Sequence, residues 1–206
     1  MDDFALLEEW RGGDTRAGND LFERHFDAVH RFFSNKAPSD AADLVQRTFL
    51  GCVEAKERFR AQSSFRTFLF AIAHHELLGH WRRTKKRAVD TSVSSLLDLE
   101  PSPSQLLARV GEERRLLEAL RSIPMDLQIA LELFYWEGLS GPEIAAVVGA
   151  PEGTVRSRLR RGLEALRARL DELDRSPGRL ATSLAGLDGW TRSIGEALLG
   201  VNASPP

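Results

Sequence analysis

Hydrophobic residues recur at every third or fourth position along most of the chain, whereas the strict alternation typical of strands is nearly absent. This spacing is that of helices with one buried face, so the sequence predicts an all-α protein. Four helices are expected before residue 84: a short one over residues 4–10, one through residues 21–33, one that begins after Ser39 or Asp40, and one over about 65–83.

The third of these predicted helices has two different faces. One face is apolar and predicts a core stripe of Ala41, Ala42, Val45, Phe49, Cys52 and Val53. The other face carries Asp43, Gln46, Arg47, Leu50 and Glu54. A leucine among polar groups has two interpretations, either a stray apolar residue on a solvated face, which is common, or part of a surface that binds a partner.

The helical pattern breaks after residue 84 and returns near residue 104. The stretch between is rich in serine and contains Pro101 and Pro103, which is typical of a linker. We therefore expect two small helical domains joined by a flexible linker. Their bounds are residues 1–85 for the first domain, 86–103 for the linker and 104–173 for the second domain, followed by a C-terminal extension over 174–206 whose role the sequence does not indicate.

The second domain contains the strongest local signal. Ser140 and Glu143 have the spacing of a capping box, Gly149 has the place of a C-terminal cap, and Pro151 suits the first turn of a following helix. A short helix, a tight turn and a longer helix predict a helix-turn-helix. The alternative is a plain helical hairpin with a basic exposed face.

The longer helix of this unit has its predicted core side at Val155, Leu159, Leu163, Leu166 and Leu170. The residues that point away from that side are Gly153, Ser157, Arg160 and Arg161, with Arg156 and Arg158 on the flanks. Outward arginines at this place favour DNA binding. An arginine can donate two hydrogen bonds to guanine in the major groove, and flanking arginines can hold phosphates.

The charge of the chain is unevenly distributed. The formal net charge of −2 excludes a uniformly basic nucleic-acid coat, but five of the six residues at 82–87 are basic and six arginines lie between 156 and 169. Such clusters suit a protein that contacts DNA at chosen places and another protein elsewhere, although either cluster alone is also compatible with a solvated helix face.

Cysteine content and hydropathy indicate the cellular compartment in which the protein acts. The single cysteine, Cys52, excludes an internal disulfide and a cysteine cluster for zinc. No apolar run is long enough to span a bilayer, and the N-terminus is acidic where a secretory signal would be basic. We therefore expect a cytoplasmic protein without a membrane partner.

At two places the sequence resembles the extracytoplasmic-function sigma factors of RNA polymerase. The segments similar to that family's polymerase-binding and minus-ten parts are Asp43-Leu44-Val45-Gln46 with Phe49, the run from Ser64 to Ala73, and Arg82-Arg83. The segments similar to its minus-thirty-five domain are Ile123-Pro124, Gly138-Leu139-Ser140, Glu143-Ile144-Ala145 and the run from Pro151 to Leu159. Together they cover about residues 4–173, in the family's order.

The resemblance implies a promoter-specific transcription initiation factor that binds core RNA polymerase, recognises promoter DNA and assists its melting. It assigns the polymerase contact to Asp43, Gln46, Arg47 and Leu50. It assigns the minus-ten element to Ser63, Ser64, Arg66, His75, Arg82, Arg83, Lys85 and Lys86. It assigns the minus-thirty-five element to Gly153, Thr154, Arg156, Ser157, Arg158, Arg160 and Arg161. Members of the family are often held inactive by an anti-sigma factor, which is therefore a possible further partner.

The chain departs from the family pattern in the first domain. Phe68 stands where tryptophan is usual, Gly79 where aspartate is frequent, and Arg47 where an acidic residue is frequent. His74-His75 replaces a common Arg-Asn pair, whose asparagine is associated with the recognition of a flipped base. The last difference bears on the minus-ten sequence that the chain prefers.

Two other classes of function stay open. A free-standing helix-turn-helix regulator would use residues 1–85 as a sensing domain and bind operator DNA as a dimer. An enzyme is disfavoured, because no nucleophile–base constellation, phosphate-binding loop, paired carboxylates or metal motif is evident. His74, His75 and His80 match no standard metal spacing, so we expect no metal and no cofactor.

Overall fold

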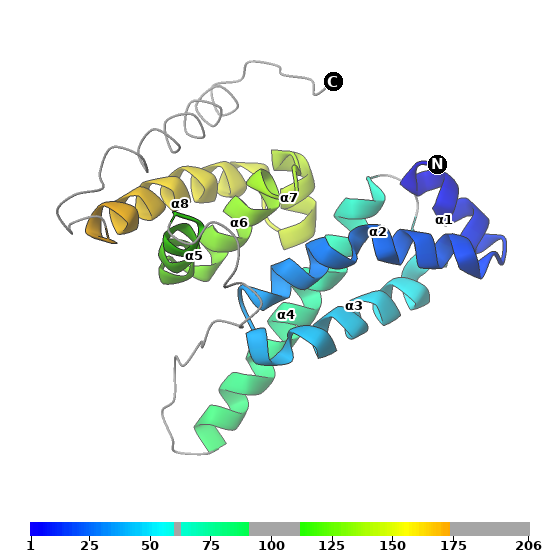
Figure 1. Ribbon diagram of the computed structural model, residues 1–206, viewed down its shortest axis with the longest axis horizontal. Helices are drawn as coiled ribbons and strands as arrows, with labels where there is room; N and C mark the ends of the chain where they lie inside the picture. The colour runs from blue at the N-terminus through cyan, green and yellow to red at the C-terminus, as the bar shows by residue number, and fades with distance from the viewer. Residues whose placement is uncertain (60–62, 91–111, 174–206) are drawn as a thin grey trace. The chain divides into compact units, whose positions relative to one another are not determined.

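The computed structural model describes residues 1–59, 63–90 and 112–173, and these residues form helices and short connections with no strand among them. The prediction of an all-α fold is confirmed (Figure 1). The α-helices are α1 (Asp3–Arg11), α2 (Thr15–Ser34), α3 (Ala41–Ala55), α4 (Phe65–Asp90), α5 (Glu112–Ser122), α6 (Met125–Tyr135), α7 (Gly141–Val148) and α8 (Glu152–Leu173). Two short 3-10 helices, η1 (Pro38–Asp40) and η2 (Lys56–Arg58), flank α3.

The chain divides into two compact units. The first comprises residues 1–105 and 132–155, and the second comprises residues 106–131 and 156–206. The chain therefore passes from one unit to the other within α6 and again within α8. The domain bounds expected from the sequence were placed on either side of the serine- and proline-rich linker, and they stay a prediction.

The first two helices begin at capping aspartates. Asp2 accepts a hydrogen bond from the backbone N–H of Ala5 at 2.8 Å, and Asp14 accepts one from that of Arg16 at 2.8 Å. Each carboxylate satisfies an N–H that has no partner within its helix and complements the positive end of the helix dipole. The two helices pack together, and Trp10 of α1 lies edge-on to Phe22 of α2.

The buried face of α3 differs from the stripe expected from the sequence. Its buried residues are Ala41, Leu44, Val45, Thr48 and Cys52. The prediction was wrong for Ala42 and Val53, which are exposed, and Phe49 is only half-buried. The buried arc instead includes Leu44 and Thr48. The Thr48 hydroxyl donates to the Leu44 carbonyl at 2.8 Å, which satisfies this polar side chain within the core.

Cys52 lies in the interior of this bundle as a free thiol. Burial raises its pKa to about 12, because the thiolate would lose its hydration there. The thiol is therefore protonated at neutral pH and behaves as a small apolar side chain.

Helix α4 is the central helix of the first bundle and is apolar over a broad part of its surface. Leu69, Phe70, Ala73 and Leu77 are fully buried, and α4 packs against α3, α2 and α7. The helix extends to Asp90, beyond the end expected near residue 83. The basic run at 82–87 interrupts the apolar period, but arginine and lysine are good helix formers and nothing in the run stops a helix.

The second unit is built from α5, the first part of α6 and most of α8. Its interior includes Leu120 of α5, Ile123 directly after that helix, Leu127 and Leu131 of α6, and a leucine stripe of α8. Gly162 of α8 is buried against Leu131, where an added Cβ would lie 3.1 Å from its Cγ. The core side predicted for α8 is confirmed, because Val155, Leu159, Leu163, Leu166 and Leu170 are all buried.

The predicted linker lies mostly outside the described residues, as does the whole C-terminal extension. Among the helices that are described, none is both long enough and apolar enough to cross a membrane.

Gly18 is required by a close approach between α1 and α2. A Cβ at this position would lie 2.6 Å from Nε1 and 2.7 Å from Cδ1 of the buried Trp10. We expect Gly18→Ala to lower the free energy of unfolding by roughly 1–3 kcal/mol, since the ring has to move within a packed interior. Urea denaturation followed by circular dichroism measures this. The matched control is Asn19→Ala on the exposed side of the same turn, and an equal loss in both variants would contradict the packing argument.

Candidate nucleic-acid interface

The helix-turn-helix predicted from the sequence is present as α7, a turn and α8. Glu143 accepts hydrogen bonds from the backbone N–H and the hydroxyl of Ser140, at 2.9 and 2.7 Å. Gly149 ends α7 in the left-handed region, with φ 62° and ψ 39°, and donates to the Ala145 carbonyl. Only glycine adopts this conformation without strain, so the chain can turn sharply into α8 after Pro151.

The arginines of α8 differ in their surroundings. Arg160 is 67% exposed and lies 3.4 Å from Glu164, one turn further along the helix. Arg161 and Arg156 are also exposed, whereas Arg158 is 25% exposed and forms an ion pair with Asp126 at 3.2 Å. The outward side of the helix is therefore basic, as expected, and Arg158 is already engaged within its own unit. Of the smaller candidates, Gly153 is exposed, and Thr154 and Ser157 are half-buried.

The first turn of α4 gathers several of the residues expected at the minus-ten element. Ser64 accepts a hydrogen bond from the backbone N–H of Thr67 at 3.1 Å and so begins the helix. Its hydroxyl also donates to Glu143 at 3.0 Å, and Arg66 forms an ion pair with the buried Glu137 at 2.6 Å. Ser63 is exposed beside them.

The other minus-ten candidates lie further along α4 and are not brought together with this turn. His75, Arg82 and Arg83 are exposed on the later turns of the helix. Lys85 and Lys86 belong to its last turns, but their side chains lie outside the described part of the chain. The structure therefore separates the candidates into a cluster at the start of α4 and a basic run toward its end.

The phenylalanines near this turn are structural. Phe65 is buried against the His25 ring, and Phe68 lies with its ring centroid 4.6 Å from that of Phe59. Arg11 donates to the carbonyls of Lys56 and Phe59, which fastens the end of η2 ahead of this turn.

Glu143 has an unusual set of hydrogen-bond donors. Its Oε1 accepts from Ser64 at 3.0 Å and from Thr67 at 2.9 Å, while its Oε2 accepts from Ser140. Partial burial acts to raise the pKa of Glu143, but the hydrogen bonds from Ser140, Thr67 and Ser64 outweigh it and hold the pKa below its ordinary value. The carboxylate is therefore ionised at neutral pH and connects α7 to the start of α4.

The polar face of α3 borders an apolar groove on the surface of the first unit. Asp43 and Arg47 form an exposed ion pair at 2.9 Å, and Leu50 is 53% exposed, as the sequence suggested. The groove has a volume of about 440 Å³ and lies between α2 and α3. Its lining consists of Phe22, Phe26 and His30 from α2 and of Ala42, Val45, Gln46, Phe49, Leu50 and Val53 from α3.

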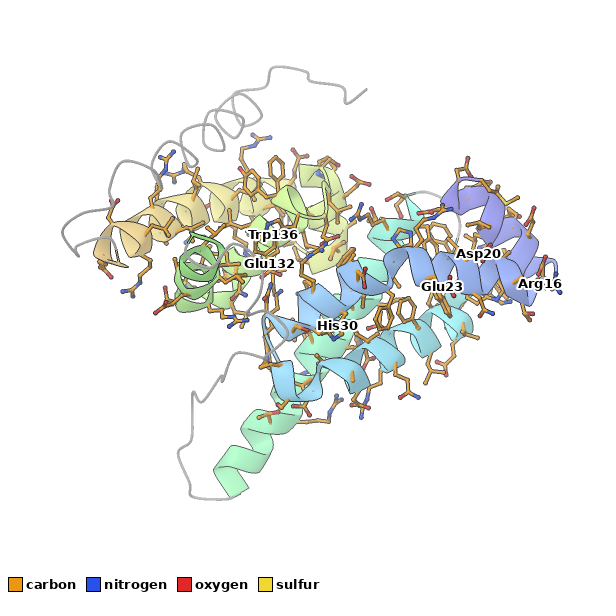
Figure 2. The ribbon with its side chains drawn as sticks, viewed as in Figure 1. Arg16, Asp20, Glu23, His30, Glu132 and Trp136 are labelled. Carbon is orange, nitrogen blue, oxygen red and sulfur yellow. The ribbon has the colours of Figure 1, made fainter. Side chains whose placement is uncertain are left out.

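The sequence did not single out the α2 side of this groove. Phe26 belongs to the apolar stripe of α2 but is 46% exposed, and His30 lies on the same helix one turn further on (Figure 2). The sequence did contain one signal for the groove: α2 and α3 together carry more aromatic residues than the interior between them needs.

Within the described residues, no three histidine, cysteine, aspartate or glutamate side chains are grouped to hold a metal ion.

Two family descriptions match the chain, one in each predicted domain. Residues 21–87 match Sigma-70 region 2, and residues 113–166 match Sigma-70 region 4. The first match begins within α2, and the second ends within α8.

The chain is also similar to characterised proteins over most of its length. It is 33% identical over 187 residues to the ECF RNA polymerase sigma-E factors of Escherichia coli (strain K12) and Salmonella typhimurium (strain LT2), covering 85% of this chain and 97% of each relative. It is 32% identical to the RNA polymerase sigma-H factor of Pseudomonas aeruginosa, covering 83% of this chain and 95% of that one.

Two solved structures have similar folds. CnrH in complex with the cytosolic domain of CnrY has a TM-score of 0.63 and 25% identity, covering 82% of this chain and 97% of that one. The sigma factor RpoE in complex with the anti-sigma factor NepR from Bartonella quintana has a TM-score of 0.63 and 23% identity, covering 78% and 98%. The likeness to the second shows the fold alone.

The ionised state of Glu143 predicts a pH dependence of stability. A carboxyl whose pKa is lowered on folding stabilises the fold above its unfolded pKa, and this contribution disappears as the pH falls through the folded pKa. We therefore expect Glu143→Gln to be less stable than the unmodified chain at pH 7, and the difference to shrink below about pH 4.5. Chemical denaturation between pH 7 and pH 3 measures it. A difference independent of pH would show that the charge of Glu143 is not what its donors stabilise.

Proposed function

Because the chain belongs to the extracytoplasmic-function family of RNA polymerase sigma factors, we propose that its described helices divide promoter recognition into three surfaces. The chain is an alternative sigma factor that binds core RNA polymerase and directs promoter-specific transcription initiation. The polymerase performs the chemistry, and this protein is not an enzyme. The observation that carries this conclusion is that both sigma regions occur on one chain, at 21–87 and 113–166.

The first proposed surface binds core polymerase. It comprises Asp43, Gln46, Arg47 and Leu50 of α3, and the groove extends it to Phe26 and Val53. Half-exposed apolar side chains beside a charged pair are the composition of a protein interface, in which a few buried apolar anchors are surrounded by polar groups.

The second proposed surface recognises the minus-ten element and helps to melt it. Its residues are Ser63, Ser64 and Arg66 at the start of α4, and His75, Arg82, Arg83, Lys85 and Lys86 along it. Hydroxyl and guanidinium donors at the first turn suit phosphates and base edges, and the basic run suits the DNA backbone. The exposed His75 stands where it can affect which base is preferred.

The third proposed surface is the outward side of α8, which would lie in the major groove at the minus-thirty-five element. Gly153 permits close approach, because no atom lies within 4 Å of the place where its Cβ would be. Thr154, Arg156, Ser157, Arg158, Arg160 and Arg161 supply the donors. Arg160 and Arg161 are the most suitable for base contacts, whereas Arg158 has to leave Asp126 before it can bind DNA.

Two further features of the proposal concern partners and place. Proteins of similar fold were solved with an anti-sigma factor or with the cytosolic domain of a second protein, so an anti-sigma factor that covers the α2–α3 groove is a natural partner for this chain. We place the activity in the cytoplasm, because the related factors act with RNA polymerase.

The experiment that tests the function is a pull-down with core polymerase in the absence of DNA, followed by run-off transcription from promoters switched on by expressing the chain. Stable association and a promoter-specific transcript are expected. Dimeric, sequence-specific operator binding without any association with polymerase would instead identify a free-standing regulator.

For the first surface, we expect Asp43→Ala and Leu50→Ala each to weaken core binding by at least about fivefold, the effect of removing an interface anchor. Glu57→Ala is the matched control, since Glu57 is exposed on η2 and does not line the groove. Titration of labelled core polymerase measures the affinity. Unchanged binding by both α3 variants would exclude this face as the contact.

For the third surface, we expect Arg160→Ala and Arg161→Ala to reduce discrimination at the minus-thirty-five element by roughly 1–3 kcal/mol for each lost bidentate contact. Lys85→Ala should instead weaken binding to all DNA sequences alike. It should also reduce the slope of log affinity against log salt concentration by about one, because one phosphate contact is lost. Transcription from matched promoters with intact and altered elements measures the first effect. Arg167→Ala, an exposed arginine further along α8, is the control for the loss of charge.

A further inference from the structure

Three glutamates of the segment 132–155 are held by donors from the first bundle. Glu137 is only 3% exposed and lies 2.7 Å from Arg31 of α2 and 2.6 Å from Arg66 of α4. Glu143 accepts from Ser64 and Thr67 at the start of α4. Glu132, on the last turn of α6 (Figure 2), forms an ion pair with Lys36. All of these residues belong to the first unit.

The Lys36–Glu132 pair lies fully in the interior. The two side chains are 0% and 2% exposed, and Nζ of Lys36 also donates to the Phe32 carbonyl at 2.9 Å. Burial lowers the pKa of Lys36 from its ordinary value, and the attraction of Glu132 opposes that change. A buried ammonium that lost its carboxylate would be strongly destabilising, so Lys36 needs either Glu132 or another anion.

The donors that these glutamates occupy are those that a DNA strand would require. Ser64 and Arg66 belong to the proposed minus-ten surface, and Arg31 is a second guanidinium on the same carboxylate. Carboxylate and phosphate oxygens are both anionic acceptors with a similar demand for hydroxyl and guanidinium donors. In this arrangement a phosphate cannot reach the same donors until the carboxylates have left.

Arg66 is also left incompletely satisfied. Its Nε is buried and has no hydrogen-bond partner among the described residues, although its Nη2 donates to Glu137. A phosphate that accepted hydrogen bonds from both Nε and Nη2 would satisfy one more donor of Arg66 than Glu137 does. The closed arrangement is therefore not the best one available to this guanidinium.

We propose that Glu132, Glu137 and Glu143 act as an internal substitute for DNA phosphates and keep a phosphate-binding surface of Arg31, Lys36, Ser64, Arg66 and Thr67 closed in the free protein. The inference rests on the proposed minus-ten role of Ser64 and Arg66, and it adds Arg31 and Lys36 as contacts to the DNA backbone. When the segment 132–155 leaves the bundle, the cations exchange carboxylates for phosphates. A partner that binds only the open form shifts the equilibrium by its preference for that form.

The test uses free, full-length protein and a fluorescein-labelled single-stranded DNA of mixed sequence, with affinity measured by fluorescence anisotropy. Because the ligand is the phosphate backbone, the promoter need not be known. Glu137→Gln is expected to raise the affinity about tenfold, within the usual range for coupled sites. Glu9→Gln, an exposed glutamate of α1 with the same change in net charge, is the matched control and is expected to give no such gain.

A second variant identifies the phosphate donor. Adding Arg31→Gln to Glu137→Gln removes a proposed DNA contact from the opened form, so the gain in affinity should be lost. Retention of the full gain in the double variant would overturn the role of Arg31. Circular dichroism establishes that both variants are folded before their affinities are compared.

Hydrogen exchange of the backbone amides of residues 63–67 measures closure without reference to DNA. Faster exchange in Glu137→Gln than in Glu9→Gln, together with the gain in affinity, is the expected result. No gain in affinity with unchanged exchange overturns the proposal. A gain without faster exchange also overturns it, because removal of a negative charge alone would then explain the binding.

The outcome is separable from that of the proposed function. Holoenzyme formation and run-off transcription by the unmodified chain test the sigma-factor surfaces, whereas anisotropy and hydrogen exchange are measured without polymerase. Active holoenzyme combined with a Glu137→Gln variant that gains nothing would refute the internal closure and leave the function standing. Failure to join core polymerase would refute the proposed surfaces, and the exchange measurement would still decide the closure.

Discussion

An ammonium group taken out of water has to keep a partner of opposite charge, and Lys36 imposes this requirement on the whole of the first unit. Its side chain is fully buried at the end of α2, and the partner, Glu132, comes from the last turn of α6. A pair like this contributes little net stability compared with an apolar pair, but it strongly disfavours arrangements that separate its members. It therefore specifies which segments of the chain pack together more than it stabilises them.

The same requirement connects the proposed surfaces. Glu137 shares one buried carboxylate between two guanidiniums, and Glu143 caps α7 while it binds the first turn of α4. Helix α7 and the start of α4 are thereby linked through hydrogen bonds to a carboxylate. Such contacts are strong in a dry environment and can be replaced by other charged acceptors, which suits a protein that has to change partners during one reaction. The α2–α3 groove is different, because its lining is apolar and binding there is favoured mainly by the removal of apolar surface from water.

Much of this arrangement could be predicted from local sequence, because local chemistry determines it. The capping box of Ser140 and Glu143, the left-handed Gly149 and the leucine stripe of α8 each depend on residues within a few positions of one another. The exposed Leu50 on a polar face was likewise visible as a local exception. The family resemblance, which rested on segments in both predicted domains, is confirmed by 33% identity to a sigma factor over 85% of the chain.

What sequence reasoning missed depends on contacts between distant residues. Lys36 and Glu132 are 96 positions apart, and neither looks unusual until both are seen to be buried. The burial of Thr48 on α3 was missed because hydrophobic periodicity does not count a hydroxyl that is satisfied within its own helix. The exposure of Phe26 depends on how closely α2 and α3 approach, and an apolar stripe is the same whether it faces a core or a groove.

The position of Cys52 determines how a signal can reach this factor. It is the only cysteine of the 206 residues, and its thiol is enclosed in the bundle with a pKa of about 12. Oxidants react with exposed thiolates, and this chain offers none at neutral pH. While the bundle is folded, Cys52 is therefore a poor target for thiol oxidants, and a signal carried by such an oxidant would have to reach the factor through a second molecule that senses it.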